Sequence, residues 1–230
     1  MKHLAKYCFY GEKNSGKTSL MSKVITKLVD GGYRVAAVKH TRGDYSLDRE
    51  GTDTYKHGDA GAEVVVFSTP VETSFIIKEQ IDVQDIMEVI SSIGISDVVL
   101  FEGFKEEKIT GIEVSSKSGW TEEEIEDIVL DIEYEINVFN ILNQLPLTDC
   151  GKCGFDTCYM MARSVVDGDV LFEDCTQTTA VKLKVNGSDI QLSEFPAEMI
   201  KQTIVGMLKS LKGVEEVKHV CIEFSAGDKR

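Results

Sequence analysis

The 230-residue sequence has few prolines, no long hydrophobic run and a shortage of positive charge. Its three prolines, with no repeats or low-complexity segments, argue against long disordered linkers. No stretch reaches the roughly 18–20 apolar residues that a membrane-spanning helix needs. The N-terminus also has no long apolar segment followed by a small-residue cleavage site. These absences predict a cytoplasmic protein without a signal peptide.

Acidic residues outnumber basic residues by 39 to 25, which leaves a formal net charge of −14. This charge repels nucleic acids and anionic membranes unless basic residues form a local patch, and the sequence contains no such patch. We therefore expect no nucleic-acid or membrane partner. A nucleotide can still bind, because backbone N–H groups hold phosphates independently of net charge.

Residues 11–20, GEKNSGKTSL, fit the phosphate-loop pattern G-x-x-x-x-G-K-[ST] without a mismatch. A short apolar strand pattern precedes them at residues 4–10, and apolar residues at helical spacing follow as far as the glycines at 31 and 32. This strand–loop–helix context is what the motif requires. The alternative is a chance match in a glycine-rich turn.

Each loop residue type has a physical role in phosphate binding. Gly11 and Gly16 would let the backbone wrap closely around a phosphate. Lys17 would place its ammonium beside the β- and γ-phosphates, and Thr18 would coordinate Mg²⁺. We predict that the whole loop binds nucleotide: Gly11, Glu12, Lys13, Asn14, Ser15, Gly16, Lys17, Thr18 and Ser19. Glu12 argues against the partitioning and metal-delivery ATPases, which carry a second lysine at that position.

A second part of the nucleotide site is predicted at residues 96–104, SDVVLFEGF. Residues 98–101 form a continuous apolar run, as in a strand buried on both faces of a parallel sheet. Glu102 follows at the carboxyl end, where ligands bind in open α/β sheets. We predict that Glu102 holds a Mg²⁺-bound water or polarises an attacking water, and that it is catalytic together with Lys17. A helix cap or a surface carboxylate is the alternative.

A polar, glycine-dotted segment lies between these motifs, after a strand predicted at residues 33–38. It contains Lys39, His40, Arg42, Asp44, Asp48, Asp53 and His57. A loop at the carboxyl edge of a sheet is suited to phosphate or substrate contact, so Asp44, Asp48 and Asp53 are nucleotide-site candidates, with Asp44 also a candidate for the outer sphere of Mg²⁺. The guanine signature N-K-x-D is absent, which leaves GTP and ATP both open at this point.

Three segments in order carry a family resemblance: GEKNSGKTSL, VAAVKHTRGDYSLDREGTDTYKHGDAGA and DVVLFEGFK. Over roughly residues 1–140 the chain resembles the molybdopterin-guanine dinucleotide biosynthesis protein B family. The resemblance implies a phosphate-loop GTP-binding protein, often a homodimer, that supplies GTP to the transferase attaching GMP to molybdopterin. It also implies at most weak GTPase activity, Thr18 and Glu102 as metal residues, and Asp44 to Asp53 lining the site. A molybdo- or tungstoenzyme is a further possible partner.

Residues 121–138 contain eight acidic residues and no basic one, with apolar residues at helical spacing. We interpret them as an acidic helix with a solvated face that ends the first domain. The predicted fold class of residues 1–140 is therefore α/β, with a mostly parallel sheet.

A cysteine cluster follows, in the arrangement C-x2-C-x4-C-x16-C: Cys150, Cys153, Cys158 and Cys175. In a reducing cytoplasm such cysteines indicate metal ligands or thiols. A helix beginning near Thr157 would aim its N-terminus at an anionic cluster. The segment resembles the four-cysteine iron–sulfur domain of corrinoid iron–sulfur proteins, although Thr176 stands where those proteins have proline. A [4Fe–4S] cluster, a structural zinc and a metal-free loop all remain open.

The last fifty residues predict a third unit, 181–230, after a cysteine-rich segment at 141–180. Two alternating runs flank Asn186-Gly187, which indicates a β-hairpin. Apolar residues at helical spacing from 199 to 211 and a strand at 217–224 complete a β-β-α-β pattern.

Two other functions fit the same motifs. The chain would be a phosphate-loop ATPase, a kinase or a metal-centre maturation protein if only the loop is shared with the resembled family. Alternatively, the cluster would be primary, as an electron carrier whose redox state the nucleotide domain senses.

Overall fold

The computed structural model describes residues 2–41, 43–115, 119–177, 181, 183–186, 188–190, 192, 194–211, 220 and 222. The chain forms two compact units, Met1–Asn143 and Gln144–Arg230. Among the described residues, no helix combines the length and apolar character needed to cross a membrane.

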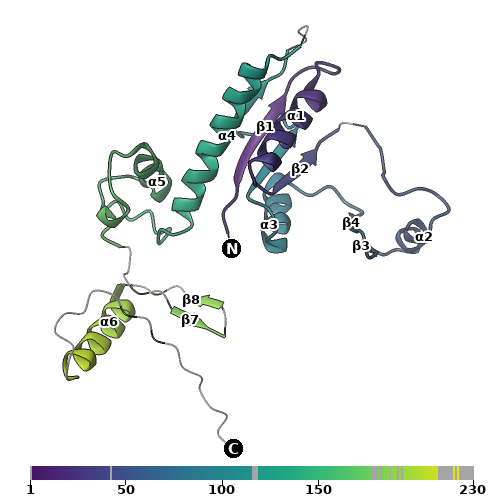
Figure 1. Ribbon diagram of the computed structural model, residues 1–230. Helices are drawn as coiled ribbons and strands as arrows, with labels where there is room; N and C mark the ends of the chain where they lie inside the picture. The colour runs from purple at the N-terminus through teal and green to yellow at the C-terminus, as the bar shows by residue number, and fades with distance from the viewer. Residues whose placement is uncertain are drawn as a thin grey trace, which may run out of the picture. The chain divides into compact units, whose positions relative to one another are not determined.

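A four-stranded parallel sheet is the centre of the first unit (Figure 1). Its strand order is β2-β5-β1-β6, with bounds Val35–Lys39, Val98–Glu102, Ala5–Tyr10 and Gly111–Glu113. Every residue of β5 is buried, because the strand has neighbours on both edges and helices on both faces. The prediction of an α/β fold with a parallel sheet is confirmed.

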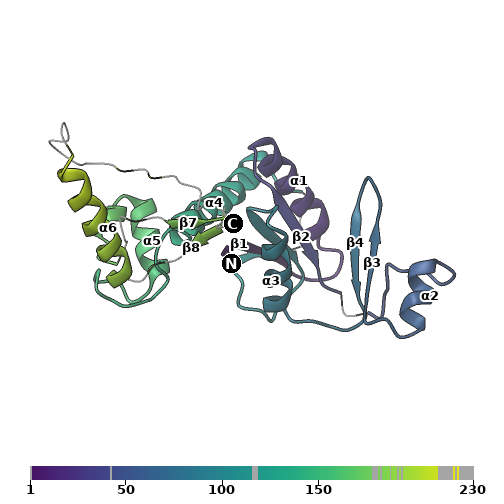
Figure 2. The same ribbon diagram turned by 90° about the horizontal axis from the view of Figure 1, so that it is seen from below.

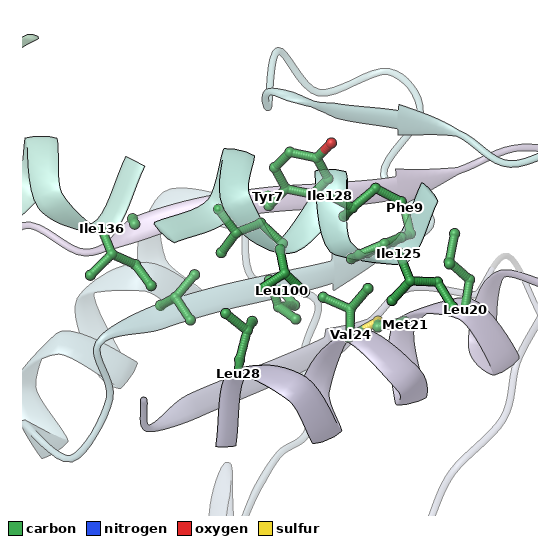
Figure 3. Close-up of a cluster of buried hydrophobic side chains, with 14 of the residues drawn as sticks. Tyr7, Phe9, Leu20, Met21, Val24, Leu28, Leu100, Ile125, Ile128 and Ile136 are labelled. Atoms are coloured by element: carbon green, nitrogen blue, oxygen red, sulfur yellow. The ribbon is translucent and has the colours of Figure 1, made fainter. Parts of the chain in front are cut away.

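Helices cover both faces of this sheet. One face packs against α1 (Lys17–Asp30) and α4 (Glu122–Leu142), where Val24 and Ile128 contact the side chains of β1 and β5 (Figure 3). The other face packs against α3 (Val83–Ile93) through Phe101 of β5. This three-layer arrangement leaves the carboxyl edge of the sheet uncovered for a ligand.

The acidic helix predicted at residues 121–138 is α4. Thr121 begins it with a capping box: its hydroxyl accepts from the Glu124 backbone N–H, and the Glu124 carboxylate accepts from the Thr121 N–H. Ile125, Ile132 and Ile136 are almost fully buried against the sheet. The acidic residues therefore occupy the remaining faces of the helix, as predicted.

The polar segment after β2 contains more structure than the sequence indicated. A short helix, α2 (Asp53–Asp59), forms its last part, and beyond it β3 (Val64–Ser68) pairs with β4 (Thr73–Ile77) as an antiparallel hairpin (Figure 2). Lys78, next after β4, forms an ion pair with Asp48 at 3.0 Å. The segment is thus tied to the end of the hairpin.

The second unit contains α5 (Cys158–Asp167), η1 (Phe172–Asp174), β7 (Leu183–Val185), β8 (Ser188–Ile190) and α6 (Glu194–Lys209). The helix predicted to begin near Thr157 is α5, and the Thr157 hydroxyl caps it by accepting from the Met160 N–H. β7 and β8 form the predicted hairpin, with Asn186 at φ 52°; Gly187 lies outside the described residues. The predicted strand at 217–224 also falls outside them, apart from residues 220 and 222. The division at residue 180 stays a prediction.

Candidate functional site

A cleft of about 1640 Å³ lies at the carboxyl edge of the four-stranded sheet. The phosphate loop, residues 11–19, forms one wall. The ends of β2 and β5, with the residues that follow them, and the start of α3 form the others. A parallel sheet brings the carboxyl ends of its strands to one edge, so the motifs predicted separately from the sequence meet here.

Glycine is required at two positions of the loop. Gly11 has φ +143°, and a Cβ placed there would lie 2.3 Å from the carbonyl oxygen of Val114. Gly16 has φ +93° and directly precedes α1. The chain therefore turns sharply into the helix, and the first N–H groups of α1 lack partners within the helix, as in other phosphate-binding helix N-termini.

The ammonium of Lys17 is held by the loop itself. Its Nζ donates to the carbonyl oxygens of Gly11, at 3.1 Å, and Glu12, and lies 3.4 Å from Ser15 Oγ. The loop thus fixes a positive charge beside the helix N-terminus, which favours an anion at this end of the cleft.

Thr18 and Glu102 are in contact across the cleft. The Thr18 hydroxyl donates to Glu102 Oε1 at 2.8 Å, and Lys39 Nζ donates to the same oxygen at 3.0 Å. The Glu102 side chain is only 11% exposed. These two donors compensate a largely enclosed negative charge.

The chemistry of this pair fits Mg²⁺. Mg²⁺ prefers oxygen ligands and is usually bound by one or two carboxylates together with phosphates of the nucleotide. Thr18 and Glu102 supply a hydroxyl and a carboxylate at adjacent positions. Within the described part of the chain, no three His, Cys, Asp or Glu side chains form a metal-binding group, so a cation here would depend on phosphate oxygens for its remaining ligands.

The three aspartates predicted for the nucleotide site lie outside the cleft lining. Asp44 is exposed, and the Asp53 side chain is 88% exposed and pairs with Lys56 at 3.0 Å. Asp48 accepts from Thr54, Lys78 and Thr52. Burial raises the pKa of Asp48, but these hydrogen bonds outweigh burial and hold the pKa below its ordinary value. These contacts join Asp48 to neighbouring residues of the same unit, and its role at the nucleotide site stays a prediction; Arg42 lies outside the described residues.

Sequence reasoning missed two features of the cleft. The sequence groups Lys39 with loop residues, whereas Lys39 ends β2 and pairs with Glu102; its position beside a buried strand is the available signal. Phe104 has φ +43°, and its ring lies 4.9 Å from that of His40. A strained non-glycine backbone is frequent at ligand sites, but no local sequence pattern indicates it here.

Three of the four predicted cluster cysteines lie at or shortly before the start of α5, and the fourth follows η1. Cys150 and Cys153 lie in the loop before α5, Cys158 is its first residue, and Cys175 follows η1. Cys158 and Cys175 are buried, whereas Cys150 is exposed. No disulfide bond joins the five cysteines of the described residues.

The backbone around these cysteines directs N–H groups at sulfur. Asp149 and Gly151 have positive φ values of 44° and 70°, and alternating left-handed residues turn N–H groups inward. A bond from the Lys152 N–H, followed by one from the Thr148 hydroxyl, lowers the pKa of Cys150. Burial raises the pKa of Cys158, although the Asp149 and Thr148 N–H groups oppose it.

The donor set therefore fits an iron–sulfur cluster in its chemistry: thiols, with N–H groups that stabilise sulfur charge. The described residues contain no three side chains already grouped around one metal position. The four sulfurs are thus not a preassembled ligand set, and the fit rests on residue type and local backbone.

Comparison with known families gives two matches. The MobB model, "Molybdopterin guanine dinucleotide synthesis protein B", matches residues 7–132. A second model, "Putative Fe-S cluster", matches residues 145–177. The two matched segments fall in the first and the second unit respectively.

Similar proteins include the "Putative molybdopterin-guanine dinucleotide biosynthesis adapter protein" of Methanocaldococcus jannaschii, 31% identical over 226 residues, with 93% of this chain and 94% of that protein covered. The "Molybdopterin-guanine dinucleotide biosynthesis adapter protein" of Haemophilus influenzae is 31% identical over 103 residues, 44% of this chain and 58% of that protein. A solved structure of Bacillus subtilis MobB is 24% identical and has a TM-score of 0.44, covering 54% of this chain and 74% of that one.

Proposed function

Because the chain belongs to the molybdopterin guanine dinucleotide synthesis protein B family, we propose that its first unit binds GTP with Mg²⁺ and acts as an adapter in the biosynthesis of the guanine dinucleotide form of the molybdenum or tungsten cofactor. The observation that carries this proposal is the contact between Thr18 and Glu102 beside an intact phosphate loop. A hydroxyl and a carboxylate at adjacent positions are ligands that suit a nucleotide-bound cation, which supports the proposal.

Different residues of the cleft bind the phosphates and the cation of the nucleotide. The backbone N–H groups of residues 11–18 hold phosphate oxygens, and Lys17 adds a fixed positive charge. Thr18 and Glu102 hold the cation, and Glu102 also orients a water molecule. Mg²⁺ supplies neutralisation of phosphate charge when bound. Because the one enclosed carboxylate, Glu102, must serve both the cation and the water molecule, we expect turnover by the chain alone to be at most slow.

The adapter role is supported by the size of the cleft. Ligand pockets for one small molecule measure roughly 300–1000 Å³, and this cleft is about 1640 Å³. We propose that the remaining space lets a partner guanylyltransferase reach the bound GTP, whose GMP moiety is then transferred to molybdopterin with release of pyrophosphate. A cytoplasmic homodimer is the proposed working form.

Equilibrium binding of GTP with and without Mg²⁺ tests this function. We expect Lys17→Ala to lose GTP binding, because it removes the charge that the loop carbonyls position. Lys23→Ala, on an exposed position of the same helix, is the matched control and should bind normally. Preference for ATP, with steady turnover and no partner, would instead support an ATPase, kinase or maturation protein.

For the second unit we propose a [4Fe–4S]-type cluster held by Cys150, Cys153, Cys158 and Cys175. The support is the family match at residues 145–177 and the N–H groups directed at cysteine sulfur. Iron, acid-labile sulfide and zinc are measured on anaerobically purified protein and on Cys153→Ser. About four irons and four sulfides, lost in the variant, are expected. One zinc without sulfide would make the unit a structural zinc module.

A further inference from the structure

Lys39 ends β2 directly beside Glu102, the last residue of β5. The two residues are register partners in the parallel pair, so their side chains leave the sheet on the same face. Lys39 Nζ lies 3.0 Å from Glu102 Oε1 and 3.5 Å from Thr18 Oγ1. Its ammonium therefore lies next to the two oxygen atoms that we assign to the cation.

An enclosed carboxylate needs a compensating charge or hydrogen-bond donors. At Glu102, whose side chain is 11% exposed, Lys39 supplies the charge and Thr18 the hydroxyl. A divalent cation at Glu102 would supply the same compensation. The ammonium and a divalent cation repel each other at such short range, so the two compete for one carboxylate.

We propose that Lys39 is a built-in counter-ion of Glu102, which the Mg²⁺–nucleotide complex displaces, and that the displaced ammonium then binds the terminal phosphate of the nucleotide. The second step rests on the proposed function, whereas competition for Glu102 does not. The device makes cation binding depend on nucleotide, since without nucleotide the carboxylate is already neutralised.

The local structure allows the ammonium to move while the strand stays in place. The N–H of His40 donates to the Glu102 carbonyl at 2.9 Å, which fixes the backbone at the end of β2. The Lys39 side chain is 62% exposed, and its four-carbon stem carries a strongly hydrated point charge. Both Lys39 and the phosphate loop line the same cleft, so the ammonium remains near the phosphates.

The first experiment measures Mn²⁺ binding to the nucleotide-free protein by electron paramagnetic resonance. Lys39→Met keeps most of the apolar stem and removes the charge, so we expect Mn²⁺ to bind about tenfold tighter or more. Lys105→Met is the matched control: Lys105 lines the same cleft and is 63% exposed, but pairs with Glu113 at 3.3 Å. Equal Mn²⁺ affinity in wild type and Lys39→Met would overturn the proposal.

A conservative variant separates charge from packing. Lys39→Arg keeps the positive charge and should bind Mn²⁺ as weakly as wild type. Lys39→Gln is a second neutral variant and should bind as tightly as Lys39→Met. Tight Mn²⁺ binding by Lys39→Arg would show that the tighter binding of Lys39→Met comes from lost packing rather than lost charge. That result would contradict the counter-ion role. The melting temperature of each variant is measured as well, to check that the variant is folded.

The second experiment compares GTP and GDP affinity in the presence of Mg²⁺. Lys39→Met should lose about tenfold of the preference for GTP, because a contact to the terminal phosphate is lost. An unchanged preference would overturn the second step. If wild type bound no guanine nucleotide but the Mn²⁺ results held, the proposed function would fail and the counter-ion role would stand. Guanine nucleotide binding with equal Mn²⁺ affinities would instead retain the proposed function and remove the counter-ion role.

Discussion

The hydroxyl of Thr18 lies 2.8 Å from Glu102 Oε1, although 84 positions separate the two residues in the sequence. Thr18 belongs to the first turn of α1, and Glu102 ends β5. The parallel pairing of β1 with β5 brings the two together, because β1 leads directly into the phosphate loop. The proposed cation site is therefore a consequence of sheet topology rather than of one local motif.

Thr18→Val tests this contact. Valine matches threonine in shape but cannot bind a cation or donate to Glu102. We expect the Mg²⁺-dependent gain in GTP affinity to fall about 10- to 100-fold, with Mg²⁺-independent binding retained. Fluorescence titration with and without Mg²⁺ measures this difference. Ser22→Ala is the control, since Ser22 lies one turn later and its hydroxyl donates to the Thr18 carbonyl; an equal loss there would remove the cation role of Thr18.

Adding a methyl group should lower the unfolding free energy by different amounts at the two loop glycines. Gly11→Ala would place Cβ 2.3 Å from the Val114 carbonyl oxygen at φ +143°, whereas Gly16→Ala meets no atom within 4 Å at φ +93°. We expect a loss of about 3 kcal/mol or more of unfolding free energy for the first and about 1–2 kcal/mol for the second. Urea unfolding measures both. Equal losses would show that backbone strain, not the contact with Val114, sets the cost at Gly11.

Much of the first unit was predictable because its signals are local. The phosphate loop needs only a strand, a glycine-rich turn and a helix in sequence, and α1 begins at Lys17 as the motif requires. The unbroken apolar run of β5 indicated a strand buried on both faces. The capping pair of Thr121 and Glu124 lies within one turn of α4.

The rest depends on pairings between distant segments. Lys39 meets Glu102 only because β2 is next to β5 in the sheet. The order of strands in a sheet cannot be predicted from the sequence of either strand alone. Asp48 was predicted as a nucleotide-site residue, and its contact with Lys78, 30 positions later, could not be read from the polar loop alone. The residue types show which chemistry these side chains can perform, whereas the fold determines which side chains they contact.

Core packing of α4 provides a stability prediction with an internal control. Ile132 is fully buried in the cluster between α4, α1 and the sheet, whereas Leu130 on the same helix is 57% exposed. Ile132→Ala should lower the unfolding free energy by about 2–5 kcal/mol, and Leu130→Ala by about 0.5 kcal/mol or less. Urea unfolding compares the two. A large loss at Leu130 would mean that another surface covers this face of α4.

Asp97 should make stability depend on pH in the acidic range. Hydrogen bonds from the Arg34 guanidinium, at 2.7 and 3.0 Å, hold the pKa of Asp97 well below its ordinary value, and the Arg34 N–H and Lys2 add to this effect. A folded-state pKa below the unfolded value of about 3.9 means that the stabilisation is complete above that pH. It is lost as pH falls from there through the folded-state pKa.

Asp97→Asn isolates this contribution. We expect the variant to lose about 1 kcal/mol of unfolding free energy at pH 7, a value that allows for the 57% exposure of the Arg34 side chain. The difference from wild type should shrink as pH falls below 4, because Asp97 of the unfolded chain then takes up a proton while the folded carboxylate, with its lowered pKa, stays ionised to lower pH. Asp53→Asn, at an 88% exposed position, should show little difference at any pH. Urea unfolding between pH 7 and pH 2.5 measures both variants, and a pH-independent loss for Asp97→Asn would indicate that shape rather than charge holds Arg34.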